Sequence, residues 1–265
     1  MFTPLPQTRY DTPAPFGPSL LPNVSHYDDV QVLALSFVTQ PEAVAPLIPR
    51  FYELAPEAVI TVSQRTLKGV DYTKGRGYNI LSVNVGVVYR GPHETVNGSH
   101  TLAVWENDTN AIIAGREFLG VPKLYGRIPD LIAHDGVWSF SCHEYDGLLV
   151  SGKASGMKPI LGEKFEAIKK LASPMVALEW KYIPGPGGVA DVDYPVKYSQ
   201  GMDIQTMYSG RGEISWGEPT AQQSPISARI IERLRALPII EYRPALLTRG
   251  PSFLHRAETR RLPWN

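Results

Sequence analysis

The sequence predicts an α+β fold in which strands predominate and a few helices lie outside the sheet. Short apolar runs rich in β-branched and aromatic residues recur along the 265-residue chain, as is typical of strands. Gly, Pro, Asn and Asp separate these runs and predict turns. Because no internal repeat, low-complexity block or interior linker is visible, we expect one domain over residues 1–265.

The chain is expected to begin with an extended N-terminal arm over residues 1–25. Four prolines between Pro4 and Pro15 exclude a regular helix there. A short helix with an early proline is expected over residues 41–47. The strands predicted in the first half cover residues 30–38, 59–65, 78–89 and 101–105, with a polar turn over 92–99. Alternation in the third of these strands places Tyr78, Ile80, Ser82 and Asn84 on one face.

The segment that follows is predicted to be helical over residues 111–118, with Asn110 as the N-cap. Gly120 and Pro122 end this helix, and Lys123 lies just past it on a turn that leads into the next strand. Further short strands are expected over residues 126–129, 136–143 and 148–154, and further helices over 163–171 and 227–237.

Composition excludes several classes of function. Acidic and basic residues number 26 each, and no long basic run is present, so we do not expect a nucleic-acid partner. No apolar run is long enough to cross a bilayer, and the start of the sequence lacks the features of a signal peptide, so a cytoplasmic location is expected. The single cysteine, Cys142, fits a strand in a reducing compartment. The histidines lack metal-ligand spacing, so neither a metal nor a cofactor is predicted.

Lys123 stands out because residues 111–125 are otherwise mostly apolar. Burial of an ammonium ion is costly, so a buried lysine is favoured as the neutral amine. A neutral amine can attack a carbonyl carbon and form a Schiff base. A solvated lysine on a loop remains the alternative for this residue taken alone.

The surrounding motif makes the lysine more specific. Gly115-Arg116-Glu117, a five-residue spacer ending in Pro122, and then Lys123 resemble the active-site segment of the acetoacetate decarboxylase family. Weaker likenesses in the same order cover residues 32–49, 156–184, 216–220 and 237–242. The resemblance implies a mostly antiparallel sheet closed into a barrel-like core, a small keto acid as substrate, and Lys123 as the residue that forms the imine, as in the known activated lysine of that family.

The chain also departs from the family pattern, which predicts a divergent member. Leu124 occupies the position of a second lysine, and apolar residues around Val30 stand where the family has an arginine. The family glutamate expected shortly after Tyr78 is absent, and a second one would align near Ser63. The burial of Lys123 would therefore have to act without an adjacent cation.

Four other residues complete the predicted site. Arg65, alone at the end of an apolar strand, is suited to binding a substrate carboxylate, although a surface arginine is an equally good interpretation. Tyr78 is suited to proton transfer, and an ordinary barrel tyrosine is again the alternative. Arg116 and Glu117 are predicted to be buried ion-pair partners that hold the lysine loop.

These observations predict a lysine-dependent lyase that forms a Schiff base with a small oxo acid. Because the partner residues for decarboxylation are missing, aldolase–dehydratase chemistry is favoured, with β-keto acid decarboxylation as the alternative. A barrel that binds a small metabolite without catalysis is the second alternative. We also predict a homo-oligomer.

Overall fold

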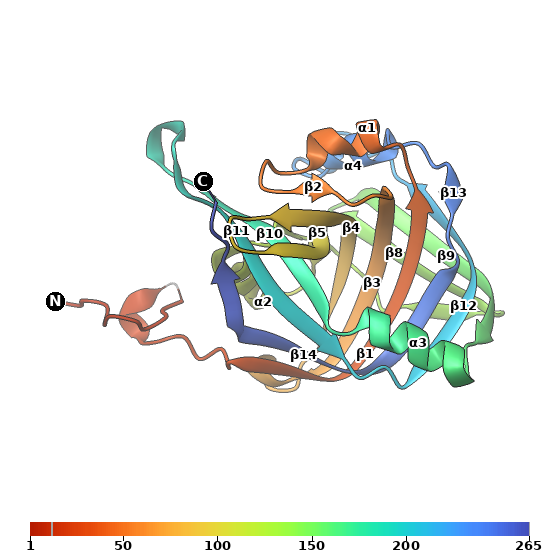
Figure 1. The fold of residues 1–265 in the computed structure, drawn as a ribbon, viewed down its shortest axis with the longest axis horizontal. Helices are drawn as coiled ribbons and strands as arrows, with labels where there is room; N and C mark the ends of the chain where they lie inside the picture. The colour runs from red at the N-terminus through yellow and green to blue at the C-terminus, as the bar shows by residue number, and fades with distance from the viewer. Residues whose placement is uncertain (12, 265) are drawn as a thin grey trace.

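The computed structural model describes residues 1–11 and 13–264, and its centre is a barrel closed by seven strands (Figure 1). Neighbouring barrel strands are antiparallel except β5 and β10, which pair in parallel at Ser99 and Ala177. Pairing of β14 with β1 closes the barrel. In their order around the barrel the strands are β1 (Val24–Val38), β3 (Val59–Val70), β4 (Tyr78–Arg90), β5 (Thr95–Glu106), β10 (Met175–Pro184), β11 (Ala190–Met202) and β14 (Ala245–Arg261).

A second group of strands extends from β14 and covers the outside of β1. In order these are β12 (Thr206–Trp216), β9 (Gly147–Pro159), β8 (Val137–Glu144) and β7 (Ile132–His134). Three short strands pair at other edges: β2 (Glu53–Leu54), β6 (Lys123–Tyr125) and β13 (Glu241–Tyr242). Both faces of β1 are therefore used. Leu33 and Leu35 are fully buried in the core shared with the outer strands, whereas Val32 and Ala34 face the barrel interior.

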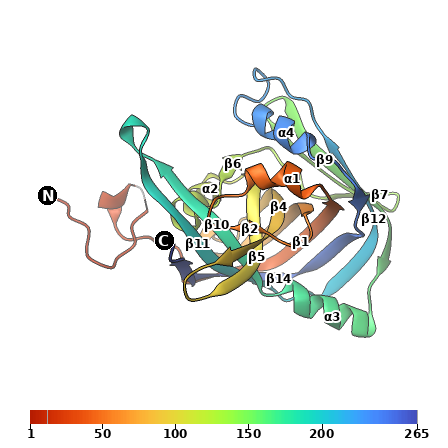
Figure 2. The ribbon, with the colours of Figure 1, turned by 45° about the horizontal axis from the view of Figure 1, so that its top comes forward.

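Helices lie outside the sheet, as predicted. They are α1 (Pro41–Val44), α2 (Thr109–Ala114), α3 (Gly162–Ala172) and α4 (Ala228–Arg235), and α2 continues as a π-helical turn over Gly115–Leu119. Short 3₁₀ turns occur at Ala14–Phe16, Ala45–Leu47, Asp71–Thr73 and Pro186–Gly188. Helix α3 crosses one mouth of the barrel, and α1 and α4 lie on the opposite side (Figures 1 and 2).

The described part of the N-terminal arm, residues 1–11 and 13–23, runs away from the barrel (Figures 1 and 2). No helix among the described residues is both long and apolar enough to cross a lipid bilayer.

The structure confirms the α+β fold with a barrel core and corrects several details. Strand β5 starts at Thr95, inside the predicted polar turn, because Thr95 to Gly98 pair with the end of β4. The N-cap of α2 is Asp108, whose side chain accepts a hydrogen bond from the Ala111 N–H at 3.0 Å, and not Asn110. Residues 126–129 form only an isolated bridge between Arg127 and His143.

Candidate active site

One end of the barrel interior contains a small buried cavity, which we call the lysine chamber. Its volume is about 70 Å³. Side chains from all seven barrel strands and from the segment after α2 converge on it. Its lining includes Tyr27, Arg65, Leu67, Tyr78, Ile80, Val104, Glu106, Leu119, Val121, Lys123, Ala177, Glu179, Tyr198 and Gln200.

Lys123 enters the chamber at the first residue of β6. The chain turns back after the π-helical segment at Gly120, whose φ of +75° suits glycine. Lys123 then pairs with Val104 of β5 in parallel register. Its Nζ lies 2.7 Å from Glu106 Oε1 and donates a hydrogen bond to the Ala111 carbonyl oxygen at 3.0 Å. Only 12% of the side chain is exposed, so Lys123 is buried and the alternative of a solvated loop lysine is wrong.

The glycine of the Gly-Arg-Glu motif makes room for the lysine. A Cβ at Gly115 would lie 2.2 Å from Lys123 Cε and 2.6 Å from Nζ, both far closer than ordinary van der Waals contact. The backbone at Gly115 is ordinary right-handed helix, with φ of −68°. Glycine is therefore required at position 115 because a larger residue would take the space of the lysine side chain, and not because of the backbone conformation.

The other two residues of the motif lie outside the chamber. Arg116 and Glu117 are both exposed, so the predicted buried ion pair is wrong. They occupy the outer side of the π-helical turn, where water solvates both charges. Arg116 Nη1 donates to the Lys123 carbonyl oxygen at 3.1 Å and so contacts the lysine backbone directly.

Glu106 is the charged partner of Lys123, and the sequence interpretation missed it. Its side chain is almost completely buried, and burial raises the pKa of the carboxyl group, while the nearby charge of Lys123 opposes this shift. The raised pKa means that Glu106 holds its proton more strongly than an exposed carboxyl group does. Because Glu106 is an acid, it does not replace the adjacent cation of the family pattern, and the expectation that burial acts on Lys123 without such a cation stays a prediction. Glu106 pairs directly across from Ile80, which stands where the resemblance implied a glutamate.

Leu124 lies on the opposite side of β6 from Lys123. It packs against the core cluster that contains Trp105, its neighbour in the β5–β6 pairing. A side chain at position 124 consequently faces the core and not the chamber.

Glu179 supplies a second buried carboxyl group. Its Oε1 accepts a hydrogen bond from Thr101 Oγ1 at 2.7 Å, and its Oε2 has no hydrogen-bond partner among the described residues. Burial raises the pKa of Glu179 to about 8, although the hydrogen bonds from Thr101 oppose this shift. His100 Nδ1 is 3.6 Å from Oε2, but burial lowers the His100 pKa to about 4, so this ring is neutral. Glu179 is therefore a protonated acid at neutral pH.

Tyr78 also lies in the chamber wall, as the alternation along its strand predicted. Its hydroxyl accepts a hydrogen bond from the Tyr72 hydroxyl at 2.7 Å. Burial raises the Tyr78 pKa well above its usual range, and it also raises the pKa of Tyr198 nearby. Both phenols therefore stay protonated and can donate hydrogen bonds.

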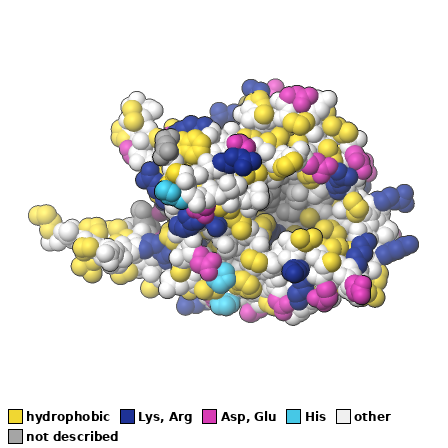
Figure 3. All heavy atoms as spheres, in the orientation of Figure 1, with side chains coloured by type: hydrophobic (Ala, Val, Ile, Leu, Met, Phe, Trp, Pro, Cys, Tyr) yellow, Lys and Arg dark blue, Asp and Glu magenta, His cyan; other side chains and the backbone are white. Residues whose placement is uncertain are grey.

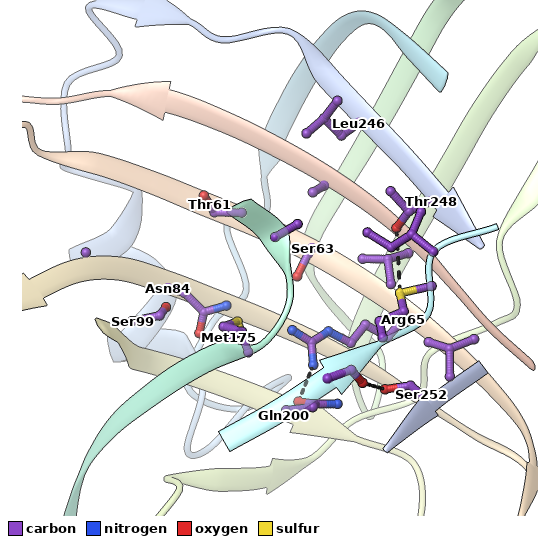
Figure 4. Close-up of a pocket in the computed structure, with 18 of the residues that line it drawn as sticks. Thr61, Ser63, Arg65, Asn84, Ser99, Met175, Gln200, Leu246, Thr248 and Ser252 are labelled. Carbon is purple, nitrogen blue, oxygen red and sulfur yellow. Dashed lines mark hydrogen bonds between the residues drawn. The ribbon is translucent and has the colours of Figure 1, made fainter. Parts of the chain in front are cut away.

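Arg65 projects from β3 at the outer limit of the chamber (Figure 4). Its Nη1 donates to Gln200 Oε1 at 2.9 Å, and its Nε has no partner within the described part of the chain. Burial lowers the Arg65 pKa from its ordinary value. Arg65 forms no ion pair with any described residue, so an anionic ligand could use its guanidinium group.

Comparison with known proteins agrees with this geometry. The sequence model of the acetoacetate decarboxylase family matches residues 5–250. This chain belongs to the acetoacetate decarboxylase family. Acetoacetate decarboxylase 1 of Bradyrhizobium diazoefficiens is 27% identical over 182 residues, which are 69% of this chain and 68% of that protein. The family and this relative support an enzyme of the lyase or decarboxylase class.

Solved structures share the fold at low identity. A structure of acetoacetate decarboxylase superimposes with a TM-score of 0.76 at 15% identity, covering 95% of this chain and 94% of that one. The enduracididine biosynthesis enzyme MppR, solved in complex with pyruvate, gives a TM-score of 0.73 at 13% identity, covering 96% and 97%. An acetoacetate decarboxylase-like enzyme from Sphingomonas wittichii RW1 gives a TM-score of 0.71 at 16% identity, covering 97% of this chain and 99% of that one.

Proposed function

We propose that this protein is a lyase that forms a Schiff base between Lys123 and a small oxo acid, and that its reaction is of the aldolase–dehydratase type. The observation that carries the proposal is the 2.7 Å contact between Lys123 Nζ and the buried carboxyl group of Glu106. A nucleophilic amine beside a proton-carrying group is the arrangement that imine formation requires.

The first stage would join the substrate to Lys123. The neutral amine attacks the carbonyl carbon, the carbonyl oxygen gains protons and leaves as water, and a protonated imine remains. Glu106 is placed to give a proton to the departing oxygen and to accept one from the nitrogen. Arg65 would hold the substrate carboxylate through charge-assisted hydrogen bonds.

The second stage would use the imine to withdraw electrons. Glu106, left as a carboxylate once its proton has gone to the departing oxygen, would take a proton from the neighbouring carbon and give an enamine. The enamine carbon attacks an aldehyde and forms a carbon–carbon bond. The new alkoxide takes a proton from a group in the wall of the lysine chamber, and elimination of water gives an unsaturated imine. Hydrolysis then returns the free lysine and an unsaturated oxo acid. Glu179 and Tyr78 are the protonated groups suited to donate to the alkoxide and to the leaving hydroxyl.

The alternative is decarboxylation of a β-keto acid through the same imine, and family membership supports it. Loss of carbon dioxide from an imine needs no base, whereas loss of a proton from carbon needs one. The carboxylate that Glu106 becomes after imine formation lies beside Lys123 Nζ and can act as that base, which favours the pathway with proton transfers. A barrel that binds a metabolite without catalysis remains the second alternative and predicts no covalent adduct.

Borohydride reduction in the presence of pyruvate tests the nucleophile. We expect an irreversible mass increase that peptide mapping places on Lys123, and we expect none in the Lys123→Ala variant. Lys164→Ala is the matched control, because Lys164 lies on the exposed surface of α3 and should leave trapping intact. An adduct on Lys164 or Lys181, or no adduct with any oxo acid, would refute the proposal.

A pair of assays tests the reaction type. We expect formation of an unsaturated product from pyruvate and benzaldehyde, followed by absorbance, and weak release of carbon dioxide from acetoacetate. Rapid release of carbon dioxide with no condensation product would establish the decarboxylase alternative instead.

A further inference from the structure

A second and larger cavity lies in the same barrel, between the lysine chamber and α3, and we call it the outer cavity. Its volume is about 390 Å³. Figure 3 shows that this face of the molecule is hollowed, and Figure 4 shows the side chains that point into the cavity. Most of the wall is apolar, with Val30, Val32, Ala34, Val59, Val85, Ala172, Met175, Met202, Ile204 and Leu246.

The polar groups of the outer cavity are largely bonded within the wall. The Thr61 hydroxyl lies 2.9 Å from that of Ser36, and the Ser63 hydroxyl lies 3.1 Å from that of Ser82. Ser252 donates to the Gly201 carbonyl oxygen at 2.7 Å. Arg65 is the one charged side chain among the described residues of the lining. A ligand in this cavity therefore meets an apolar surface with a single cation at its inner end.

The two cavities share part of their walls. Five residues line both: Arg65, Asn84, Ser99, Met175 and Gln200. The lysine chamber, at about 70 Å³, has room for only a few atoms, since a water molecule occupies about 30 Å³ in the liquid. An oxo acid whose carbonyl lies at Lys123 has no room in the chamber for a long substituent, and the outer cavity, which shares this wall, is the adjacent space that could hold one.

We propose that the outer cavity binds an apolar chain of the oxo acid, so that the substrates or products of this enzyme are 2-oxo acids with an apolar substituent. The proposal rests on the function proposed above, because it places the carbonyl group at Lys123. From its volume the outer cavity can hold on the order of ten groups the size of a water molecule. A chain of several carbon atoms, or an aromatic ring with a short linker, fits this size.

Two wall residues make the size of the outer cavity adjustable. Ala34 of β1 and Leu246 of β14 are directly paired in the antiparallel ladder, and both line the outer cavity. Ala34→Leu narrows the cavity and Leu246→Ala widens it at the neighbouring position. The double variant exchanges the two side chains and restores the total volume.

Chain-length dependence of binding tests the proposal without imine chemistry. We would titrate the Lys123→Ala variant with 2-oxobutanoate, 2-oxohexanoate, 2-oxooctanoate and 2-oxodecanoate by calorimetry. We expect affinity to rise by roughly threefold per methylene group that enters the outer cavity, and then to level off. Affinity that does not depend on chain length would overturn the proposal.

The size variants locate the chain within the barrel. In Ala34→Leu we expect at least a tenfold loss of affinity for the longer acids, with borohydride trapping of pyruvate unchanged in rate. The double variant should recover most of that loss, which a general folding defect would not allow. An equal loss of affinity for acids of every chain length, or no recovery of affinity in the double variant, would overturn the proposal. Failure of pyruvate trapping in the parent protein would instead refute the proposed lyase function, while the titrations would still report on the apolar chain.

Discussion

Gly115 offers the sharpest test of how the lysine is positioned. In Gly115→Ala the new Cβ would lie 2.2 Å from Lys123 Cε, whereas ordinary contact begins at 3.4 Å. The lysine side chain must therefore move by about 1 Å, which changes its contacts with Glu106 and the Ala111 carbonyl oxygen. A misplacement of this size in an active site costs about 100-fold in rate.

The same substitution should leave the fold intact. Gly115 has helical dihedral angles, and alanine in a helix is more favourable than glycine by up to about 1 kcal/mol. The clashing atoms belong to the flexible end of a side chain, so the backbone has no need to shift.

We would measure the rate of borohydride-trappable imine formation with pyruvate, and the free energy of unfolding in urea, for the parent and Gly115→Ala. Ile113→Ala is the control, because Ile113 is exposed on the same helix and its loss should change neither imine formation nor the lysine position. A parental imine rate in Gly115→Ala would show that Lys123 does not need its observed position. Loss of both rate and stability would show that the clash reaches the backbone.

Three further predictions concern the charged groups. Glu106→Gln keeps the shape of the side chain and removes the group that carries the proton, so imine formation should slow by about 100-fold or more. An unchanged rate of imine formation in stopped-flow trapping would show that Glu106 takes no part in the mechanism. Glu179 has a folded pKa of about 8, above the ordinary carboxyl value, so its contribution to stability is complete below about pH 4.5 and is lost as the pH rises towards 8. Urea unfolding should therefore show stability falling by a few kcal/mol over this window, and the fall should be smaller in Glu179→Gln. Arg65→Met should raise KM for oxo acids by about 10-fold to 100-fold, and equal KM values would show that Arg65 binds no carboxylate.

The sequence was sufficient for the fold class, and it drew attention to the lysine that lines the lysine chamber. Alternation along residues 78–84 correctly placed one face of β4 towards the interior. Lys123 was expected on a turn just before a strand, and it is the first residue of β6. The N-cap of α2 was misplaced by two residues, because Asp108 and Asn110 are both good caps and only the backbone path separates them.

The buried carboxyl groups could not be found in the same way. Both faces of the barrel strands are buried here, one against the outer strands and one towards the cavities, so burial does not reveal which side chains reach the chamber. Glu106 directly follows the strand predicted over residues 101–105, and the sequence analysis assigned it no role. Glu179 reaches the chamber from β10, which neighbours β5 through a pairing between residues far apart in sequence. The sequence signal that could have identified Glu179 was its position as an isolated glutamate within an apolar strand.

Glu106 also shows why a residue-by-residue comparison misjudged this site. The glutamate expected shortly after Tyr78 is absent, yet Ile80, which is near that position on β4, is the cross-strand partner of Glu106 on β5. Directly opposed side chains in an antiparallel pair begin only about 5 Å apart, which is within the reach of a glutamate. A barrel wall can therefore present a carboxyl group to the same lysine from either strand. The chemistry available to this chain depends on which groups line the chamber, and not on which strand carries them.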